Sequence, residues 1–136
     1  MATQKGLRYN AGKLKWGLVD YKALEPMVRV LMYGAHKYSL FKNKSGKIIK
    51  GSQISEENAY KYLLYYSGAN NWKNGLDKRE ILECAMRHLA LLMDGERIDK
   101  ESKLPHSGHI LCNMMFYSYF EQLPELFKKK LKTKKK

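Results

Sequence analysis

Apolar residues recur at the three- and four-residue spacing of an amphipathic helix in three stretches of the chain. We expect a first helix after Asp20, which either starts near Pro26 behind a short turn or kinks at that proline. We expect a second helix from Asp77 to Asp94, and a third that begins near His106 and ends at about 121. In the second stretch Asp77 stands where a capping residue belongs, and Gly95 follows the helix end. The stripe of this helix that we expect to be buried consists of Leu82, Ala85, Met86, Leu89, Leu92 and Met93.

The remaining segments are less regular. Residues 6–18 contain a turn sequence and predict an extended N-terminal arm. Residues 42–51 are polar with an apolar pair near the end, which indicates a loop or a small hairpin. A further helix is expected from Ser55 to Tyr66, and no stretch argues convincingly for a sheet. The predicted fold is therefore all-α: a small bundle of about four helices with an N-terminal arm and a hairpin insertion, completed by oligomerisation.

Composition sets the domain organisation. The chain has 136 residues, 44% of them hydrophobic, which suits one domain with its own core. The formal net charge is +13, but seven lysines stand in residues 128–136 and leave +6 on the rest. A terminal lysine run repels itself, so we expect 128–136 to be a disordered tail. Residues 1–127 would form a single helical domain.

The two cysteines indicate the compartment. Cys84 and Cys112 stand in apolar helical patterns without metal-ligand spacing, which predicts reduced, buried thiols. No apolar stretch follows the N-terminus, and no run of about 18 apolar residues predicts a membrane span. We therefore expect a cytoplasmic protein that does not enter the membrane.

Four carboxylates form the first candidate site. Glu80 and Glu83 lie three residues apart on one helical face, and Glu96 and Asp99 repeat that spacing in the following segment. Carboxylate oxygens on two adjoining elements suit Mg²⁺, which usually keeps water and substrate phosphates in its shell. The alternative is structural, because Glu80 would also serve as a capping residue and spaced acidic pairs are common on helix surfaces.

Two further sets could contact a ligand. His88, His106 and His109 could bind metal, hydrogen-bond a base or transfer protons, or they could simply be satisfied structural residues. A basic and aromatic set could contact phosphates and a base, with Arg87 able to grip a phosphate or to pair with Glu83 instead. Its members are Lys37, Trp72, Lys73 and Arg87. The tryptophan could equally fill the core.

Ordered short motifs then suggest a family. They are Gly6–Lys13, Tyr33–Tyr38, Asn71–Gly75, Arg87–Leu89, Gly95–Glu96, Asp99, Glu101–Ser102, Leu104–His106, His109 and Asn113. Each is weak alone, but the ordered set over about residues 6–120 resembles the phage-associated dATP/dGTP diphosphohydrolase N-terminal domain family. That family looks like a branch of the MazG-like all-α NTP pyrophosphatases. The resemblance implies magnesium bound by a Glu-x-x-Glu and a Glu-x-x-Asp motif, and assembly into a homo-oligomer, usually a dimer.

Two departures from the family pattern stand out. About thirty residues separate Tyr38 from Asn71, where the family passes almost directly between the two motifs. Lys103 stands where the family pattern has glycine. The insertion would lie near the mouth of the site and Lys103 beside it. Either change could alter which ligand is preferred, or could produce a protein that binds a nucleotide without cleaving it.

The leading interpretation is a dNTP pyrophosphohydrolase that releases a nucleoside monophosphate and pyrophosphate. Magnesium on some of Glu80, Glu83, Glu96 and Asp99 would bridge the phosphates and lower the pKa of an attacking water, with the last three as catalytic carboxylates. Lys13, Lys37 and Arg87 would neutralise charge, and aromatic and imidazole rings would hold base and sugar. The full nucleotide-binding set is Lys13, Lys37, Trp72, Arg87, His88, His106, His109 and Asn113.

The rival interpretation is a phage binding protein, a sponge that sequesters a nucleotide immune signal without cleaving it. The carboxylate set separates the two, since a sponge needs no positioned water. A third reading, nucleic-acid binding through the lysine tail, has no groove-reading motif behind it, so specific binding of that kind is not expected. If the chain is phage-encoded, its compartment would be the cytoplasm of a bacterial host.

Overall fold

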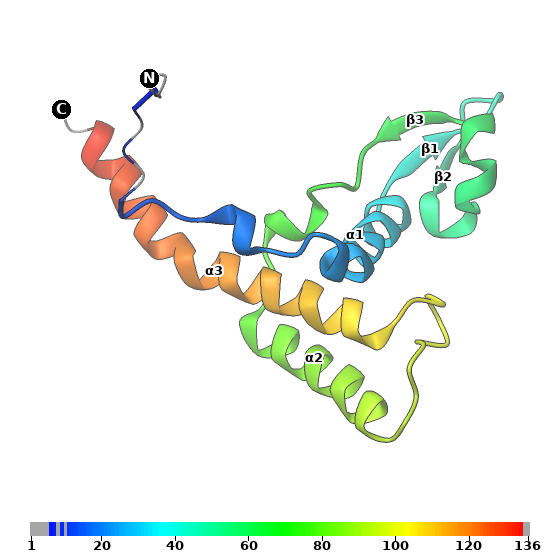
Figure 1. Cartoon of the computed structure of the whole chain (residues 1–136). Helices are drawn as coiled ribbons and strands as arrows, with labels where there is room; N and C mark the ends of the chain where they lie inside the picture. Colours follow the sequence, from blue (N-terminus) through cyan, green and yellow to red (C-terminus); the bar gives the residue numbers. More distant parts are fainter. Residues whose placement is uncertain (1–5, 8, 10, 135–136) are drawn as a thin grey trace, which may run out of the picture.

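The computed structural model describes residues 6, 7, 9 and 11–134, with side chains as far as 124. The described chain is mostly helical and carries one small antiparallel sheet (Figure 1). Its α-helices and strands are α1 (Glu25–Lys37), β1 (Leu40–Lys42), β2 (Ile48–Lys50), β3 (Leu63–Tyr66), α2 (Lys78–Met93) and α3 (His106–Lys134). Short 3₁₀ turns connect them at Trp16–Leu18, Lys22–Leu24, Gly51–Gln53, Glu56–Lys61 and Asn71–Asn74.

The three helices follow the predicted pattern closely. Pro26 occupies the first turn of α1, where its missing N–H costs nothing. Asp77 caps α2 by accepting a hydrogen bond from the Arg79 N–H at 3.0 Å. Gly95, with a φ of 96°, ends that helix in the left-handed conformation that glycine favours. Local sequence signals therefore set both ends of α2.

The long helix α3 holds the other helices together. It packs lengthwise against α2 and also crosses α1, while the sheet lies beyond the far end of α1 (Figure 1). The described arm before α1 is mostly exposed and contains two 3₁₀ turns. Among the helices described, none combines the length and apolar character needed to cross a membrane.

The segment between α1 and the Asn71–Asn74 turn differs from the prediction. Residues 42–51 do form a hairpin, but the helix expected from Ser55 to Tyr66 is wrong. A 3₁₀ turn over Glu56–Lys61 leads instead into β3, so the sheet has the order β2-β1-β3. The physical reason is the aromatic run that ends this segment, which suits a pleated strand, and the free edge of β1 that it can pair with. The all-α prediction is thus correct for most of the chain and wrong for this insertion.

Backbone contacts attach the insertion to the end of α1. The Ser39 hydroxyl donates to the Ala35 carbonyl at 2.6 Å and accepts from the Gly68 N–H at 2.9 Å. A Cβ atom at Gly68 would come within 2.5 Å of the Ala35 oxygen, so this crossing requires glycine. His36 adds a hydrogen bond from its ring to the Ile54 carbonyl. These bonds fix where the sheet leaves the helical part.

Two further predictions need correction or remain open. On α2 the buried positions are Ile81 and Ala85, whereas Met86, Leu89 and Met93 are exposed, because only α3 covers this helix in the single chain. The helix α3 continues to Lys134, past its predicted end near 121. The structure therefore places most of the lysine-rich segment on a helix, and its independence from the domain stays a prediction.

Candidate functional site

The loop between α2 and α3 brings the acidic residues to the start of α3. It folds back on itself as a narrow hairpin, in which the Asp99 N–H donates to the Leu104 carbonyl at 2.8 Å and the His106 N–H donates to the Arg97 carbonyl at 2.9 Å. Lys103 lies at the tip with a φ of 63°. Because the hairpin is closed by backbone bonds, its carboxylates take fixed positions against the two helices.

A chain of hydrogen bonds links α2, α3 and this hairpin. His106 is 0% exposed, and its Nε2 lies 2.9 Å from Glu96 Oε2. Its Nδ1 lies 2.8 Å from His88 Nδ1. A carboxylate can only accept, so His106 donates through Nε2, and its Nδ1 then accepts from His88 in the neutral ring. This order satisfies both nitrogens of the buried His106 ring.

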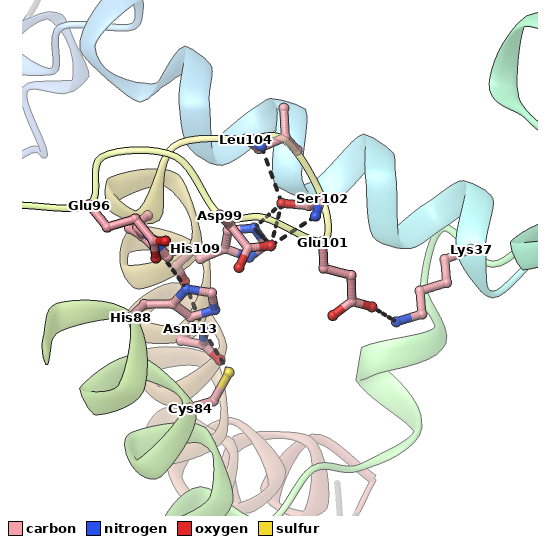
Figure 2. Close-up of polar contacts among 11 residues, drawn as sticks. Lys37, Cys84, His88, Glu96, Asp99, Glu101, Ser102, Leu104, His109 and Asn113 are labelled. Atoms are coloured by element: carbon pink, nitrogen blue, oxygen red, sulfur yellow. Dashed lines mark hydrogen bonds and ion pairs between the residues drawn. The ribbon is translucent and has the colours of Figure 1, made fainter. Parts of the chain in front are cut away.

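A second network surrounds Asp99 (Figure 2). Its Oδ2 accepts from the Ser102 N–H at 2.8 Å and from the Ser102 hydroxyl at 2.9 Å. That hydroxyl has one proton, so His109 Nε2, 2.7 Å away, donates to it. The His109 ring also stacks on His88 with centroids 4.3 Å apart. Asn113 completes the set by donating to the His109 carbonyl at 2.8 Å.

The electrostatics of the two networks favour uncharged imidazoles and an ionised carboxylate. Burial lowers the pKa of His88, and the neighbouring His109 lowers it further. Burial also lowers the pKa of His109 against the opposing pull of Asp99. For Asp99 burial acts to raise the pKa, but the two hydrogen bonds from Ser102 outweigh it and the pKa falls. Near pH 7 the neutral rings of His88 and His109 therefore lie beside the negatively charged carboxylate of Asp99.

A pocket of about 380 Å³ opens beside these networks. Its walls come from α1, the Asn71–Asn74 turn, α2, the hairpin and α3, and the volume is in the range of small-molecule sites. The polar side chains in the lining include Lys37, His88, Asp99, Glu101, Ser102, His109 and Asn113. Tyr33, Tyr38 and Trp72 supply aromatic surface. A ligand in this pocket would meet an amine on one side and the histidine–carboxylate networks on another.

Two predicted contacts, Lys37 and Trp72, have dual roles. Lys37 Nζ lies 3.6 Å from Glu101 Oε1 and near the rings of Tyr33 and Tyr38, so an anionic ligand would compete with a partly exposed ion pair. Trp72 stacks on Phe116 at 4.6 Å and meets Tyr119 edge-on, while still contributing to the pocket wall. Trp72 therefore packs against the aromatic residues of α3 and also lines the pocket.

The remaining predicted residues lie away from the pocket. Glu80 and Arg87 are exposed on α2, and neither belongs to the pocket lining. Glu83 pairs with Arg79 at 3.3 Å on the same exposed surface. Lys13 is exposed in the N-terminal arm. Arg87 and Lys13 thus gain no support as phosphate contacts from the single chain.

The four carboxylates do not come together in the single chain. Among the described residues, the only three metal-binding side chains whose donor atoms lie within 4.8 Å of one another are His88, Asp99 and His106. Glu96 reaches this group only through His106. The Glu-x-x-Glu pair on α2 is separate, so a magnesium site built from all four acids does not fit the chain as it folds alone.

Sequence reasoning gave too little weight to three residues. Ser102 connects Asp99 to His109, and the Asp-x-x-Ser spacing at a turn could have indicated its hydrogen bonds. Glu101 holds Lys37, which no spacing rule reveals. Cys112 lines the pocket, but burial raises the pKa of its thiol to about 12, so it is not a nucleophile near neutral pH.

Fold and site together define a mostly helical protein whose pocket adjoins a cluster of histidines and carboxylates. The family model for the dATP/dGTP diphosphohydrolase N-terminal domain matches residues 3–130, and the chain belongs to this family. The match confirms the resemblance inferred from the ordered motifs. No curated protein and no solved structure matches the chain.

Proposed function

We propose that the protein is a deoxynucleoside triphosphate pyrophosphohydrolase that releases a monophosphate and pyrophosphate. The observation that supports this most is the pocket itself, which adjoins an ionised Asp99 and neutral histidines and carries the Lys37 amine in its wall. The membership of the dATP/dGTP diphosphohydrolase N-terminal family points to a purine deoxynucleotide. Hydrolysis of a phosphoanhydride needs charge neutralisation and a base near an attacking water, and the lining offers both.

The residues divide the work by position. Lys37 would leave Glu101 and neutralise phosphate charge, since the ion pair is 3.6 Å long and partly exposed. Tyr33, Tyr38 and the free edge of Trp72 would hold the base. His109 lines the pocket and burial lowers its pKa, so its unprotonated ring nitrogen is the proton acceptor that we assign to a water bound there.

In this proposal Mg²⁺ binds together with the phosphates of the nucleotide. Mg²⁺ is commonly bound through one or two carboxylates plus substrate phosphates. Asp99 is the one member of the predicted carboxylate set that lines the pocket, so it is the acid placed to meet such an ion. When bound, a divalent ion would supply charge neutralisation at the phosphates.

Pyrophosphate release tests the function directly. Purified protein is incubated with each dNTP and Mg²⁺, and pyrophosphate and monophosphate are measured. We expect turnover with at least one purine dNTP, and at least a tenfold loss in Lys37→Ala. Lys78→Ala is the matched control, because Lys78 lies outside the pocket lining at the start of α2. Triphosphate or inorganic monophosphate as product would contradict the proposed reaction.

A non-catalytic sponge is the second candidate function. One observation favours it: the carboxylates expected for catalysis are dispersed, with Glu83 paired to Arg79 on an exposed surface. The protein would then capture a nucleotide immune signal in the pocket and release it unchanged. Recovery of intact ligand after denaturation, with no turnover under any divalent metal, would select the sponge over the enzyme.

Association of chains is part of the proposal. Met86, Leu89 and Met93 follow one face of α2 and are 68%, 47% and 81% exposed, which is unusual for a helix of a folded domain. A second copy that covers this face would also complete the bundle implied by the family resemblance. Light scattering during size-exclusion chromatography should give a mass of at least two chains, and Met86→Glu should reduce it to one. A monomeric wild type would contradict the assembly and leave the single-chain pocket intact.

The remaining expectations are also proposals. The chain would act in the cytoplasm, in a bacterial host if it is phage-encoded, and without specific binding to nucleic acid. The full chain could bind DNA of any sequence and lose that binding when residues 128–136 are deleted. This result would show a charge effect of the lysine-rich segment rather than a recognition site.

A further inference from the structure

Three side chains from three different elements converge beside the pocket. His88 comes from α2, Asp99 from the hairpin and His106 from the first turn of α3, and their donor atoms lie within 4.8 Å of one another. Two imidazole nitrogens and one carboxylate oxygen therefore lie close together, although their residues are up to eighteen positions apart in the sequence. A set of three protein ligands with further positions left open is typical of catalytic metal sites.

The partners of these residues orient them as metal ligands. Glu96 Oε2 accepts from His106 Nε2 at 2.9 Å, which leaves the lone pair of His106 on Nδ1, the atom that faces His88. A carboxylate behind a histidine is the arrangement that commonly supports a metal-bound imidazole. Ser102 holds Oδ2 of Asp99 with two hydrogen bonds, and no described residue bonds Oδ1. The opposite sides of His106 and Asp99 are thus held by Glu96 and Ser102, and the two Nδ1 atoms bond only to each other among the described residues.

The spacing of the two nitrogens is close to what a shared ion requires. His88 Nδ1 and His106 Nδ1 lie 2.8 Å apart. Two nitrogens that are each about 2.1 Å from one ion lie roughly 3.0–3.4 Å apart, depending on the angle at the metal. Replacing the proton between the rings by an ion therefore needs a few tenths of an ångström of separation and a turn of the rings that points both lone pairs at the ion.

We propose that His88, Asp99 and His106 bind one divalent transition-metal ion at the end of the pocket, with Glu96 and Ser102 positioning the ligands. Two imidazole nitrogens favour ions such as Mn²⁺, Co²⁺ or Zn²⁺ over Mg²⁺, which prefers oxygen ligands. His88 and Asp99 line the pocket whereas His106 lies behind them, so the open positions of the ion face the ligand space. The site can be measured without a nucleotide, so it goes beyond the proposed function.

The competing explanation is a purely structural hydrogen-bond chain that ties the hairpin to both helices. It accounts for the contacts of His106 but predicts no affinity for metal. It also predicts that the carboxylate of Asp99 matters only for its bonds to Ser102. Metal binding by the folded, nucleotide-free protein therefore separates the two explanations.

Cobalt titration of the full chain provides the first test. We expect saturable binding of one Co²⁺ per chain, with visible absorption bands that Zn²⁺ abolishes and a large excess of Mg²⁺ does not. Thiolates are the soft ligands that would compete, so the spectrum should lack the intense near-ultraviolet band of a cobalt thiolate. Absence of saturable binding, or a thiolate spectrum from Cys84 and Cys112, would overturn the proposal without any variant.

Matched variants locate the ion. Asp99→Asn and His88→Asn should each weaken Co²⁺ binding at least about tenfold, and Glu96→Gln should weaken it by about tenfold to a hundredfold through His106. Glu83→Gln makes the same carboxylate-to-amide change outside the cluster and should leave binding unchanged. Circular dichroism confirms that each variant is folded. Loss of the ion in Glu83→Gln, with retention in Asp99→Asn, would assign the metal to the Glu80 and Glu83 pair on α2 instead.

Activity is kept as a separate readout. Cobalt binding without pyrophosphate release from any dNTP would leave the metal site standing and contradict the hydrolase. Turnover that depends on Mg²⁺ in a protein that binds no Co²⁺ would support the hydrolase and contradict the metal site. The two proposals can therefore fail independently.

Discussion

The hairpin with α2 and α3 and the insertion at 40–66 are held in different ways. In the first region side chains bond to side chains, as in the series Glu96, His106 and His88, and the last of these lines the pocket. In the insertion the strands are short, β3 is exposed along its whole length, and the attachment to α1 relies on Ser39 and on two glycine crossings. The comparison indicates that chemistry is concentrated in the first region, whereas the second adds surface beside it.

The largest expected effect is on turnover and comes from Asp99. Asp99→Asn removes the charge that lines the pocket while keeping the size of the side chain, and we expect pyrophosphate release to fall at least about a hundredfold. Glu83→Gln on the exposed face should cost less than about threefold if the single-chain geometry is the working site. Initial rates with the preferred dNTP measure both. A total loss of turnover in Glu83→Gln would show that the Glu-x-x-Glu pair belongs to the active site, either through a second copy of the chain or through a rearrangement.

The next effect is on stability and comes from His106. His106→Ala removes a fully buried ring and leaves Glu96 and His88 without their shared partner. We expect the free energy of unfolding to fall by about 2–4 kcal/mol, as for other losses of a buried polar network. Urea denaturation followed by circular dichroism measures it. A change under about 1 kcal/mol would show that the network does not hold the hairpin against α3.

Gly51 tests how the insertion is attached. A Cβ atom there would collide with the His36 carbonyl, so Gly51→Ala should lower stability by about 1–3 kcal/mol through a backbone shift. The pocket residues on α2 and α3 are remote from this crossing, so Co²⁺ binding should not change. Gly17→Ala is the control, because nothing lies within 4 Å of a Cβ there. Loss of metal binding in Gly51→Ala would mean that the two regions are coupled.

A smaller effect is expected at Lys103. Its φ of 63° is in the left-handed region, where a non-glycine residue costs about 1–2 kcal/mol. Lys103→Gly should raise the free energy of unfolding by no more than about 1 kcal/mol, because glycine loses more entropy on folding. Thermal unfolding measures it, with Lys100→Gly, which is also exposed, as a comparison. A clear loss of stability in Lys103→Gly would show that the lysine side chain contributes to the hairpin.

The smallest effect should follow deletion of residues 128–136. This segment is seven lysines with one leucine and one threonine and offers little apolar surface to bury, so the melting temperature and nucleotide affinity should remain nearly unchanged. Differential scanning calorimetry and nucleotide titration of the shortened chain check this. A large fall in either would place the lysine-rich segment in the domain or in its ligand site.

The sequence by itself determined the helical regions and the family. Periodic apolar positions, Asp77 and Gly95 predict α2 almost to the residue, because helix ends depend on contacts within one or two turns. It also named nearly every residue of the histidine and carboxylate networks. It left open whether Glu83 and Asp99 meet, because they stand on two different elements, and in the single chain their donor atoms do not form one cluster.

The tertiary structure decided what sequence spacing cannot. Pairing of β3 with β1 depends on strands that meet only after the chain has folded, so the tyrosine run at 62–66 gave no reliable local signal. The convergence of His88, Asp99 and His106 depends on the packing of α2 against α3 and on the closure of the hairpin between them. Local patterns fix helices because their bonds are local, whereas a site drawn from three elements exists only when long-range packing sets the distances between them.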